Sequence, residues 1–124
     1  MNIYESAEDY LERILIIQHE KGYVRSIDIA HELNFSKPSV SVAMKKLREN
    51  DYIKVDDSGY ITLTDSGYKI ASSILERHEV LTTLLKQLGV SDEVAAQDAC
   101  KIEHDLSDET FACIKKHYQE HVKK

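Results

Sequence analysis

The stretch at 26–63 constrains the fold more strongly than any other part of the sequence. Its first segment, SIDIAHEL, carries apolar residues at helical spacing and is interrupted at 34–36. Ser36 is placed to cap a second, longer helix, with Pro38 in its first turn, that runs to about Asn50. A short helix, a tight turn and a longer helix predict a helix-turn-helix.

Two short runs rich in β-branched and aromatic residues follow at once, at 52–55 and 60–63. The residues between them, Asp-Asp-Ser-Gly, favour a turn, so the two runs predict a β-hairpin. A hairpin directly after a helix-turn-helix is a wing. Together with a helix predicted at 7–20, these elements predict a winged helix-turn-helix domain, with three helices and a hairpin wing, over residues 1–65.

The rest of the chain predicts three further helices, at 65–88, 92–105 and 108–121. Their apolar faces exceed what a small winged helix could cover, so we expect residues 66–124 to form an α-helical dimerisation domain. The fold class is therefore mainly α. The residues expected to cap the predicted helices are small and hydroxylated: Ser6, Ser26, Ser36, Thr64, Ser91 and Ser107.

Composition limits the classes of function. The net charge of −6 over 124 residues argues against indiscriminate binding of nucleic acid, because the field of the whole molecule repels phosphate. No apolar run is long enough to span a membrane and the N-terminus does not resemble a signal peptide, so we predict a cytoplasmic protein with no membrane partner. Two cysteines are too few for a disulfide framework, which leaves thiols or metal ligands.

The second helix of the predicted helix-turn-helix is positively charged, although the whole chain is negatively charged. From Lys37 to Asn50 it carries lysines and an arginine against one acid, Glu49, which suits binding to phosphate. Its short serines can approach DNA closely, and Val42 can contact a thymine methyl group. The alternative is an ordinary surface helix with solvated lysines, but the following hairpin favours DNA. The residues expected to contact DNA are Ser36, Lys37, Pro38, Ser39, Ser41, Val42, Lys45, Lys46 and Lys54.

Cys100, Glu103 and His104 stand at i, i+3 and i+4, so a helix at 92–105 would project all of them from one face. A thiolate, a carboxylate and an imidazole suit a first-row transition ion. Each residue alone has an ordinary alternative, such as a buried thiol or a solvated acid. Further donors on other predicted helices favour a shared metal site over separate explanations; these are Asp9, Glu12 and His78.

His117 and His121 also have the i, i+4 spacing of metal ligands. They lie in a lysine-rich segment, and HYQEH lacks the glutamate placement of the zinc-protease signature, so we interpret them as solvated side chains. Cys113 lies on the predicted inward stripe with Phe111 and Ile114 and is expected to be a core thiol.

Several motifs occur in order along nearly the whole chain: EDYLERI, DIAHELNFSKPSVSVAMKKL, GYITLTDSGYKIA, RHEVL and ACKIEHDLSDE. Together they resemble the diphtheria toxin repressor family of metal-dependent transcriptional regulators. The resemblance implies a homodimer in which divalent metal between the two domains orders the winged helices for binding to double-stranded operator DNA, repressing metal-uptake genes. The metal ligands that it implies are Asp9, Glu12, His78, Cys100, Glu103 and His104.

In length the sequence looks most like the manganese transport regulator branch of that family, without the SH3-like domain of many members. In that branch the position of Cys100 is usually glutamate, whereas the iron-responsive branch has cysteine there but methionine at the position of Asp9. The sequence thus combines features of the two branches. It is compatible with either Mn²⁺ or Fe²⁺ as the bound metal, and with either one or two ions per subunit.

Two other classes of function are a regulator without metal and a metallohydrolase that uses Cys100, Glu103 and His104. A metal-independent winged-helix regulator that responds to a small organic effector is the main alternative. We predict no enzymatic activity and no organic substrate, because no nucleophile-and-base pair or glycine-rich substrate loop accompanies the metal donors.

Overall fold

The computed structural model describes residues 5–121, in two compact units that are divided between Ser72 and Ser73. The division falls inside the helix α4 (Asp65–Gln87). The domain limit at residue 65, drawn from the sequence, remains a prediction. No helix of the described residues is long and apolar enough to cross a membrane.

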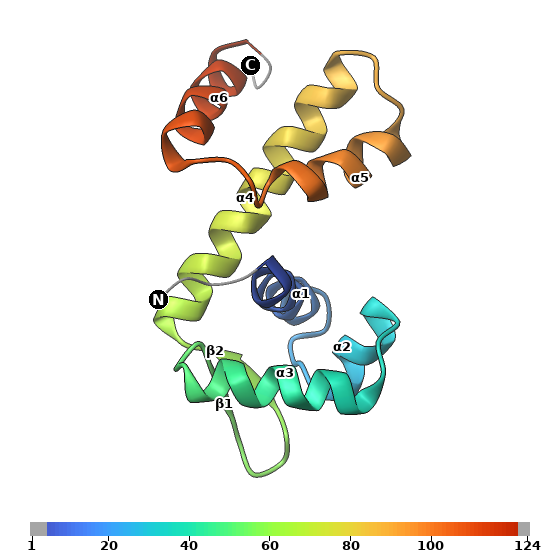
Figure 1. Cartoon of the computed structure of the whole chain (residues 1–124), viewed down its shortest axis with the longest axis vertical. Helices are drawn as coiled ribbons and strands as arrows, with labels where there is room; N and C mark the ends of the chain where they lie inside the picture. The colour runs from blue at the N-terminus through green and yellow to red at the C-terminus, as the bar shows by residue number, and fades with distance from the viewer. Residues whose placement is uncertain (1–4, 122–124) are drawn as a thin grey trace. The chain divides into compact units, whose positions relative to one another are not determined.

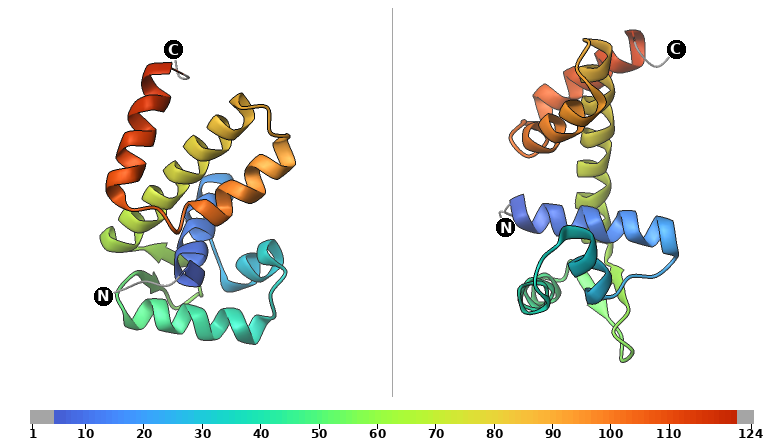
Figure 2. Two further views of the ribbon diagram at one scale, coloured as in Figure 1. Left: turned by 45° about the horizontal axis from the view of Figure 1, so that its top comes forward. Right: turned by 90° about the vertical axis from the view of Figure 1, so that its right-hand side faces the viewer.

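The first unit contains three complete helices, a two-stranded antiparallel hairpin and the start of a fourth helix (Figures 1 and 2). The strands are shorter than predicted, and Lys54 lies opposite Thr62 in their register. The mainly helical fold with a winged helix-turn-helix is confirmed. The elements are α1 (Glu5–Lys21), α2 (Ser26–Leu33), α3 (Lys37–Glu49), β1 (Ile53–Val55), β2 (Ile61–Leu63) and the first part of α4.

The helix α1 supplies the centre of this unit and contacts α2, α3 and β2. Its apolar stripe includes Leu11, Ile14 and Ile17, whose side chains are completely buried. Each such side chain contributes roughly 1.5–3 kcal/mol by leaving water. On the other elements, Ile29 and Val40 are also completely buried, so α2 and α3 are held by an apolar core.

The turn between α2 and α3 is set by its backbone. Asn34 adopts the left-handed conformation (φ 56°), and its N–H donates to carbonyl groups in the last turn of α2, which ends that helix. Ser36 then caps α3 as predicted, because its Oγ accepts a hydrogen bond from the Ser39 N–H at 3.3 Å. The sharp turn leaves α3 with an exposed outer face.

Two of the predicted caps are wrong. Helix α1 begins at Glu5, so Ser6 is already inside it. Helix α2 begins at Ser26, and Arg25 occupies the cap position, where its N–H donates to the Asp28 carboxylate at 2.9 Å. The same carboxylate accepts a hydrogen bond from Lys21 and raises the pKa of that amine. The predicted caps Thr64, Ser91 and Ser107 are confirmed, each accepting a hydrogen bond from a backbone N–H.

The base of the wing is held to the start of α4 by hydrogen bonds to two backbone carbonyl groups. The Tyr52 carbonyl accepts from the Thr64 N–H at 3.0 Å. The Asp51 carbonyl accepts from the hydroxyl groups of Thr64 at 2.6 Å and Ser66 at 3.2 Å. In the first turn of α4, Gly67 lies so close that a Cβ there would overlap the Tyr52 carbonyl oxygen.

Replacing Gly67 with alanine should therefore displace the wing from α4. We expect the free energy of unfolding to fall by about 2 kcal/mol, the usual cost of forcing a methyl group into a packed site. Urea denaturation measures this change. Ser73→Ala, at an exposed position of the same helix, is the matched control and should change stability by less than about 0.5 kcal/mol. Equal stability of the two variants would contradict the contact.

The second unit contains the rest of α4, α5 (Asp92–Ile102) and α6 (Asp108–His121). Small buried residues, Ala95 and Ala99, lie on α5, and Phe111 is buried on α6. The predicted helix at 92–105 is thus too long, since Glu103 caps it and the residues after it form a turn.

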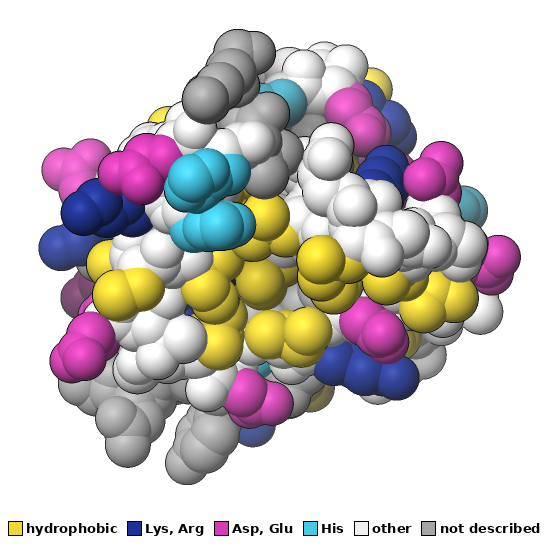
Figure 3. Space-filling view, turned by 90° about the horizontal axis from the view of Figure 1, so that it is seen from above, with side chains coloured by type: hydrophobic (Ala, Val, Ile, Leu, Met, Phe, Trp, Pro, Cys, Tyr) yellow, Lys and Arg dark blue, Asp and Glu magenta, His cyan; other side chains and the backbone are white. Residues whose placement is uncertain are grey.

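An apolar face of this unit remains exposed. Figure 3 shows one face of the molecule, on which apolar side chains gather beside histidines. Leu88 is 80% exposed and Val94 is 43% exposed. Cys113 is also exposed, so the prediction of a core thiol is wrong within a single chain. An exposed apolar face of this kind is typical of a surface that a partner covers.

Candidate functional site: a DNA-binding surface and a metal centre

The predicted DNA-contacting residues lie on the outer side of α3, at its N-terminus and on β1. All of these side chains are exposed, and Val42 is 57% exposed despite being apolar. A hollow of about 500 Å³ opens between α3 and the wing. Its lining residues are Arg25, Ser26, Ile27, Lys37, Ser41 and Gly59. A smaller hollow beside it is lined partly by Lys45 and Arg48. The surface is therefore cationic, polar and concave, which suits a DNA backbone.

The sequence analysis missed Arg25 at this surface. Its Nη2 donates to the Ser58 carbonyl of the wing turn at 2.8 Å, and its guanidinium lies 5.1 Å from the centre of the Tyr60 ring. Arg25 also pairs with Tyr60 through a β-bridge. These contacts join α2 to the wing across a long stretch of sequence. The sequence signal that could have revealed Arg25 is a basic residue directly before the predicted helix-turn-helix.

In the second unit, the C-terminal end of α5 brings together Cys100, Glu103 and His104. One ligand atom from each of these side chains lies within 4.8 Å of the others. The helix ends at Ile102, but Glu103 keeps right-handed helical angles (φ −58°, ψ −28°), so the predicted grouping survives the early end. Cys100 is exposed, whereas the Glu103 side chain is fully buried and that of His104 is 2% exposed.

His78 joins this group from α4, because its Nδ1 lies 3.0 Å from Glu103 Oε2. The second carboxylate oxygen, Oε1, lies 3.5 Å from His104 Nε2 and makes no hydrogen bond within the described chain. A buried carboxylate costs free energy unless a cation or hydrogen bonds compensate it. Glu103 therefore fits a divalent cation, and the imidazole and thiol donors around it suit a first-row transition metal.

The other predicted metal ligands belong to α1 in the first unit. Asp9 and Glu12 stand at i and i+3, so they project from one side of that helix. Asp9 is half-buried, and Glu12 is 7% exposed. The i, i+4 pair His117 and His121 lies exposed on α6, with ring centres 4.5 Å apart, as solvated side chains were predicted to be.

Two family models together match nearly the whole chain. The model described as "Iron dependent repressor, N-terminal DNA binding domain" matches residues 2–60, and "Iron dependent repressor, metal binding and dimerisation domain" matches residues 64–123. The chain belongs to the iron-dependent repressor family. The family consists of metal-dependent transcriptional regulators, so the resemblance noted from the motifs is confirmed, and the chain combines a DNA-binding domain with a metal-binding and dimerisation domain.

Similar curated proteins are named as transcriptional regulators. The HTH-type transcriptional regulator MntR of Geobacillus kaustophilus is 40% identical over 102 residues, covering 82% of this chain and 72% of the relative. The transcriptional regulator MntR of Escherichia coli O6:H1 is 35% identical over 117 residues, covering 94% of this chain and 76% of the relative.

Solved structures of the family share the fold. A "manganese-dependent transcriptional repressor complex with manganese" is 31% identical and superimposes with a TM-score of 0.80 over 89% of this chain. The manganese regulator SloR is 27% identical, with a TM-score of 0.79 over 96% of this chain. The chain spans 51% and 55% of the lengths of these two structures.

Proposed function

We propose that this chain is a cytoplasmic repressor of manganese- or iron-uptake genes that binds operator DNA as a homodimer when it carries a divalent metal, without enzymatic activity. The observation that carries the proposal is the buried Glu103 carboxylate, whose Oε1 makes no hydrogen bond with residues 5–121 and lies among imidazole and thiol donors. The similar solved structures named as a manganese-dependent transcriptional repressor and as a manganese regulator support it.

We further propose the complete ligand set. Glu103 is its central member, because both of its oxygens lie near imidazole nitrogens. The carboxylates of Asp9 and Glu12 add two acids from α1, which is the central helix of the DNA-binding unit. The proposed ligands are Asp9, Glu12, His78, Cys100, Glu103 and His104.

A bound divalent ion supplies positive charge that lets these carboxylates and a thiolate lie close together. Without it, Asp9, Glu12 and Glu103 repel one another, and the conformers in which they approach are poorly populated. A ligand that binds one conformer preferentially shifts the population toward it. The proposed result is a fixed separation of the two recognition helices α3 in the dimer, matched to half-sites about one DNA turn, or a multiple, apart.

The proposed contacts with DNA follow the exposed side of α3. Lys37, Lys45 and Lys46, with Lys54 on the wing, neutralise phosphates. Ser36, Pro38, Ser39, Ser41 and Val42 lie at the N-terminal turns of α3, which in a helix-turn-helix approach the base edges. The exposure of Val42 supports this assignment, since an apolar side chain there can contact a thymine methyl group.

Anaerobic titration of DNA binding with Mn²⁺, Fe²⁺ and Zn²⁺ in turn tests the proposal, using a fragment that contains the protein's own promoter. We expect at least one ion to increase the affinity for that fragment. If no ion does so for this or any other promoter fragment, the proposal of metal-dependent DNA binding fails. If instead Glu103→Ala with His104→Ala leaves operator binding intact, the alternative of an organic effector gains support.

Cys100→Glu should shift the metal preference toward Mn²⁺, because a carboxylate is a harder donor than a thiolate. The expected result is a higher ratio of Mn²⁺ to Fe²⁺ affinity than in the wild type, measured by direct metal titration and by DNA binding. Cys100→Ala separates loss of the thiol from gain of the carboxylate. Cys113→Ala, at the other exposed thiol, should leave the ratio unchanged. An unchanged ratio in Cys100→Glu would show that Cys100 does not set selectivity.

A further inference from the structure

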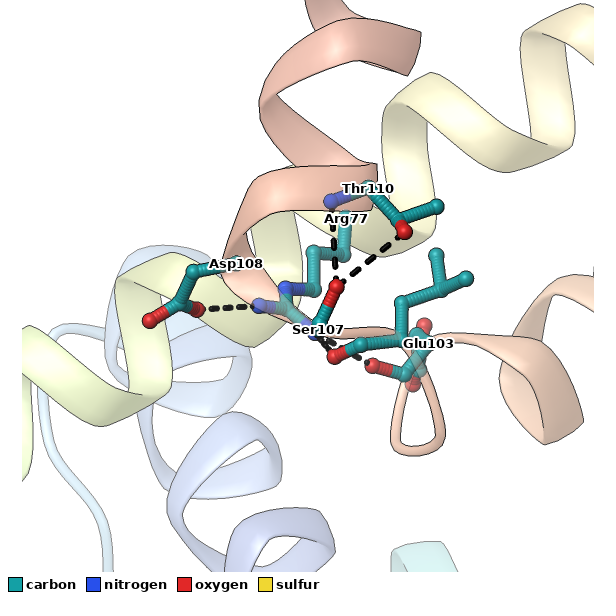
Figure 4. Close-up of polar contacts among 6 residues, drawn as sticks. Arg77, Glu103, Ser107, Asp108 and Thr110 are labelled. Atoms are coloured by element: carbon teal, nitrogen blue, oxygen red, sulfur yellow. Dashed lines mark hydrogen bonds and ion pairs between the residues drawn. The ribbon is translucent and has the colours of Figure 1, made fainter.

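Arg77 on α4 is buried to 93% of its surface, with 7% exposed, and its guanidinium holds the segment that follows α5. Nη1 donates to the carbonyl oxygens of Glu103 at 3.1 Å and Leu106 at 2.8 Å. Nη2 donates to the Asp108 carboxylate at 2.7 Å. Figure 4 shows these bonds converging on one side chain from both sides of the turn between α5 and α6.

Arg77 bonds the backbone just beyond the end of α5. The last carbonyl groups of a helix have no partner within the helix, and a cation at that end stabilises them. Arg77 provides hydrogen bonds to the Glu103 carbonyl, just beyond Ile102, and to the Leu106 carbonyl in the turn. These two hydrogen bonds hold the backbone on both sides of His104, which is a proposed metal ligand.

His78 follows Arg77 on α4 and also contacts Glu103, from a different direction. Arg77 bonds the main-chain carbonyl of Glu103, whereas His78 Nδ1 lies 3.0 Å from its side-chain carboxylate. Neighbouring residues of a helix point about 100° apart, so Arg77 and His78 can contact different parts of one residue. Through them, α4 contacts both the backbone and the side chain of Glu103. Fixing the backbone limits the directions in which the carboxylate can point.

The far side of the turn is fixed as well. Asp108 is in the first turn of α6, and the Arg77 guanidinium lies 5.2 Å from the centre of the Phe111 ring on the same helix. Ser107 caps α6 by accepting from the Thr110 N–H at 3.1 Å (Figure 4). The segment that contains Glu103 and His104 is thus held at both ends, and Arg77 takes part at each.

We propose that Arg77 is a positioning residue of the metal centre, which holds the turn after α5 so that Glu103 and His104 present their ligand atoms to the ion. The inference rests on the proposed metal site. Arg77 does not itself bind the ion, because a guanidinium has no acceptor atom for a cation. Residues that orient metal ligands typically change metal affinity by about 10- to 100-fold when they are replaced.

The test measures Mn²⁺ affinity and the absorption spectrum of bound Co²⁺ for the full-length chain and its variants. Arg77→Met keeps an apolar stem of similar length but removes every donor, and we expect about 10- to 100-fold weaker Mn²⁺ binding with an altered Co²⁺ spectrum. Arg77→Lys keeps the charge but not the planar fork, and should lie between Arg77→Met and the wild type. It also keeps the test usable if Arg77→Met does not fold.

Two controls separate positioning from a general loss of stability. Gly67→Ala lowers stability in the other unit, so it should keep the wild-type Co²⁺ spectrum. Asp108→Asn weakens only the contact with α6 and should reduce Mn²⁺ affinity less than Arg77→Met. Thermal unfolding of the metal-free variants allows affinities to be compared at temperatures where every variant is folded.

The possible results are distinct. If the wild type binds Mn²⁺ and the Arg77 variants bind it equally well with an unchanged Co²⁺ spectrum, the positioning role is wrong and the proposed function stands. If the wild type binds neither Mn²⁺ nor Co²⁺, the proposed function and this inference both fail. Weaker binding with a changed spectrum in Arg77→Met, but not in Gly67→Ala, supports the inference.

Discussion

Replacing Glu103 with glutamine is expected to weaken Mn²⁺ binding by more than about 100-fold, beyond the usual effect of losing a residue that only orients a ligand. The variant keeps the size of the side chain but removes the buried negative charge that fits the cation. Isothermal titration measures the change directly. The same substitution should abolish the increase in DNA affinity that we propose for the metal-bound wild type.

Stability provides an independent measurement of the same variant. At an Mn²⁺ concentration about 100 times its dissociation constant, binding should stabilise the wild type by about 2.7 kcal/mol. A variant with about 100-fold weaker binding should gain only about 0.4 kcal/mol at that concentration. Glu109→Gln is the matched control, because Glu109 is an exposed glutamate of the same unit. Wild-type metal stabilisation in Glu103→Gln would remove Glu103 from the ligand set.

Replacing both Lys37 and Lys45 with alanine is expected to reduce operator affinity on the order of 10³-fold at 0.1 M salt, provided that each lysine neutralises one phosphate. Both side chains are exposed, and each lines a hollow between α3 and its neighbours. Four lysines are lost from a dimer. The slope of log affinity against log salt concentration should therefore become shallower by about 3.6.

Fluorescence anisotropy with saturating Mn²⁺ and a labelled promoter fragment measures this slope over a series of salt concentrations. Lys116→Ala is the control, because Lys116 is exposed on α6 and lies outside the proposed DNA-binding surface. Its slope should equal that of the wild type. If the double variant keeps the wild-type slope, these lysines do not contact phosphate and α3 is not the element that meets the DNA backbone.

Local sequence patterns predicted most of the fold. Helical spacing and the Ser36 cap defined the helix-turn-helix, and the turn residues at 56–59 defined the wing. The errors occur where distant residues decide a local feature. Arg25 pairs with Tyr60 on the wing and takes the cap position expected for Ser26.

The α6 helix shows a second reason for error. An apolar stripe indicates that a helix face will be covered, but it does not indicate whether the same chain or another molecule covers it. Cys113 was assigned to the core on this basis and lies exposed in the single chain. Leu88 belonged to the predicted stripe at 65–88 but lies beyond the end of α4 and is largely exposed.

For the candidate metal centre, spacing predicted the grouping of Cys100, Glu103 and His104, which the structure brings together. Their roles as ligands, with Asp9, Glu12 and His78, remain predictions. Arg77 could not be predicted, because two of its acceptors are backbone carbonyl groups that any residue could provide. The structure also ends α5 at Ile102, earlier than the sequence predicts.

Different residues stabilise the base and the tip of the wing. At its base, the contacts with α4 use the carbonyl groups of Asp51 and Tyr52 and the glycine at 67. At its tip, the Asp56 carboxylate accepts from the N–H groups of Ser58 and Tyr60, and the side chain of Asp57 is exposed. Substitutions at the tip should thus change the surface that the wing offers to the proposed DNA partner without moving its base, so the two properties can be altered separately.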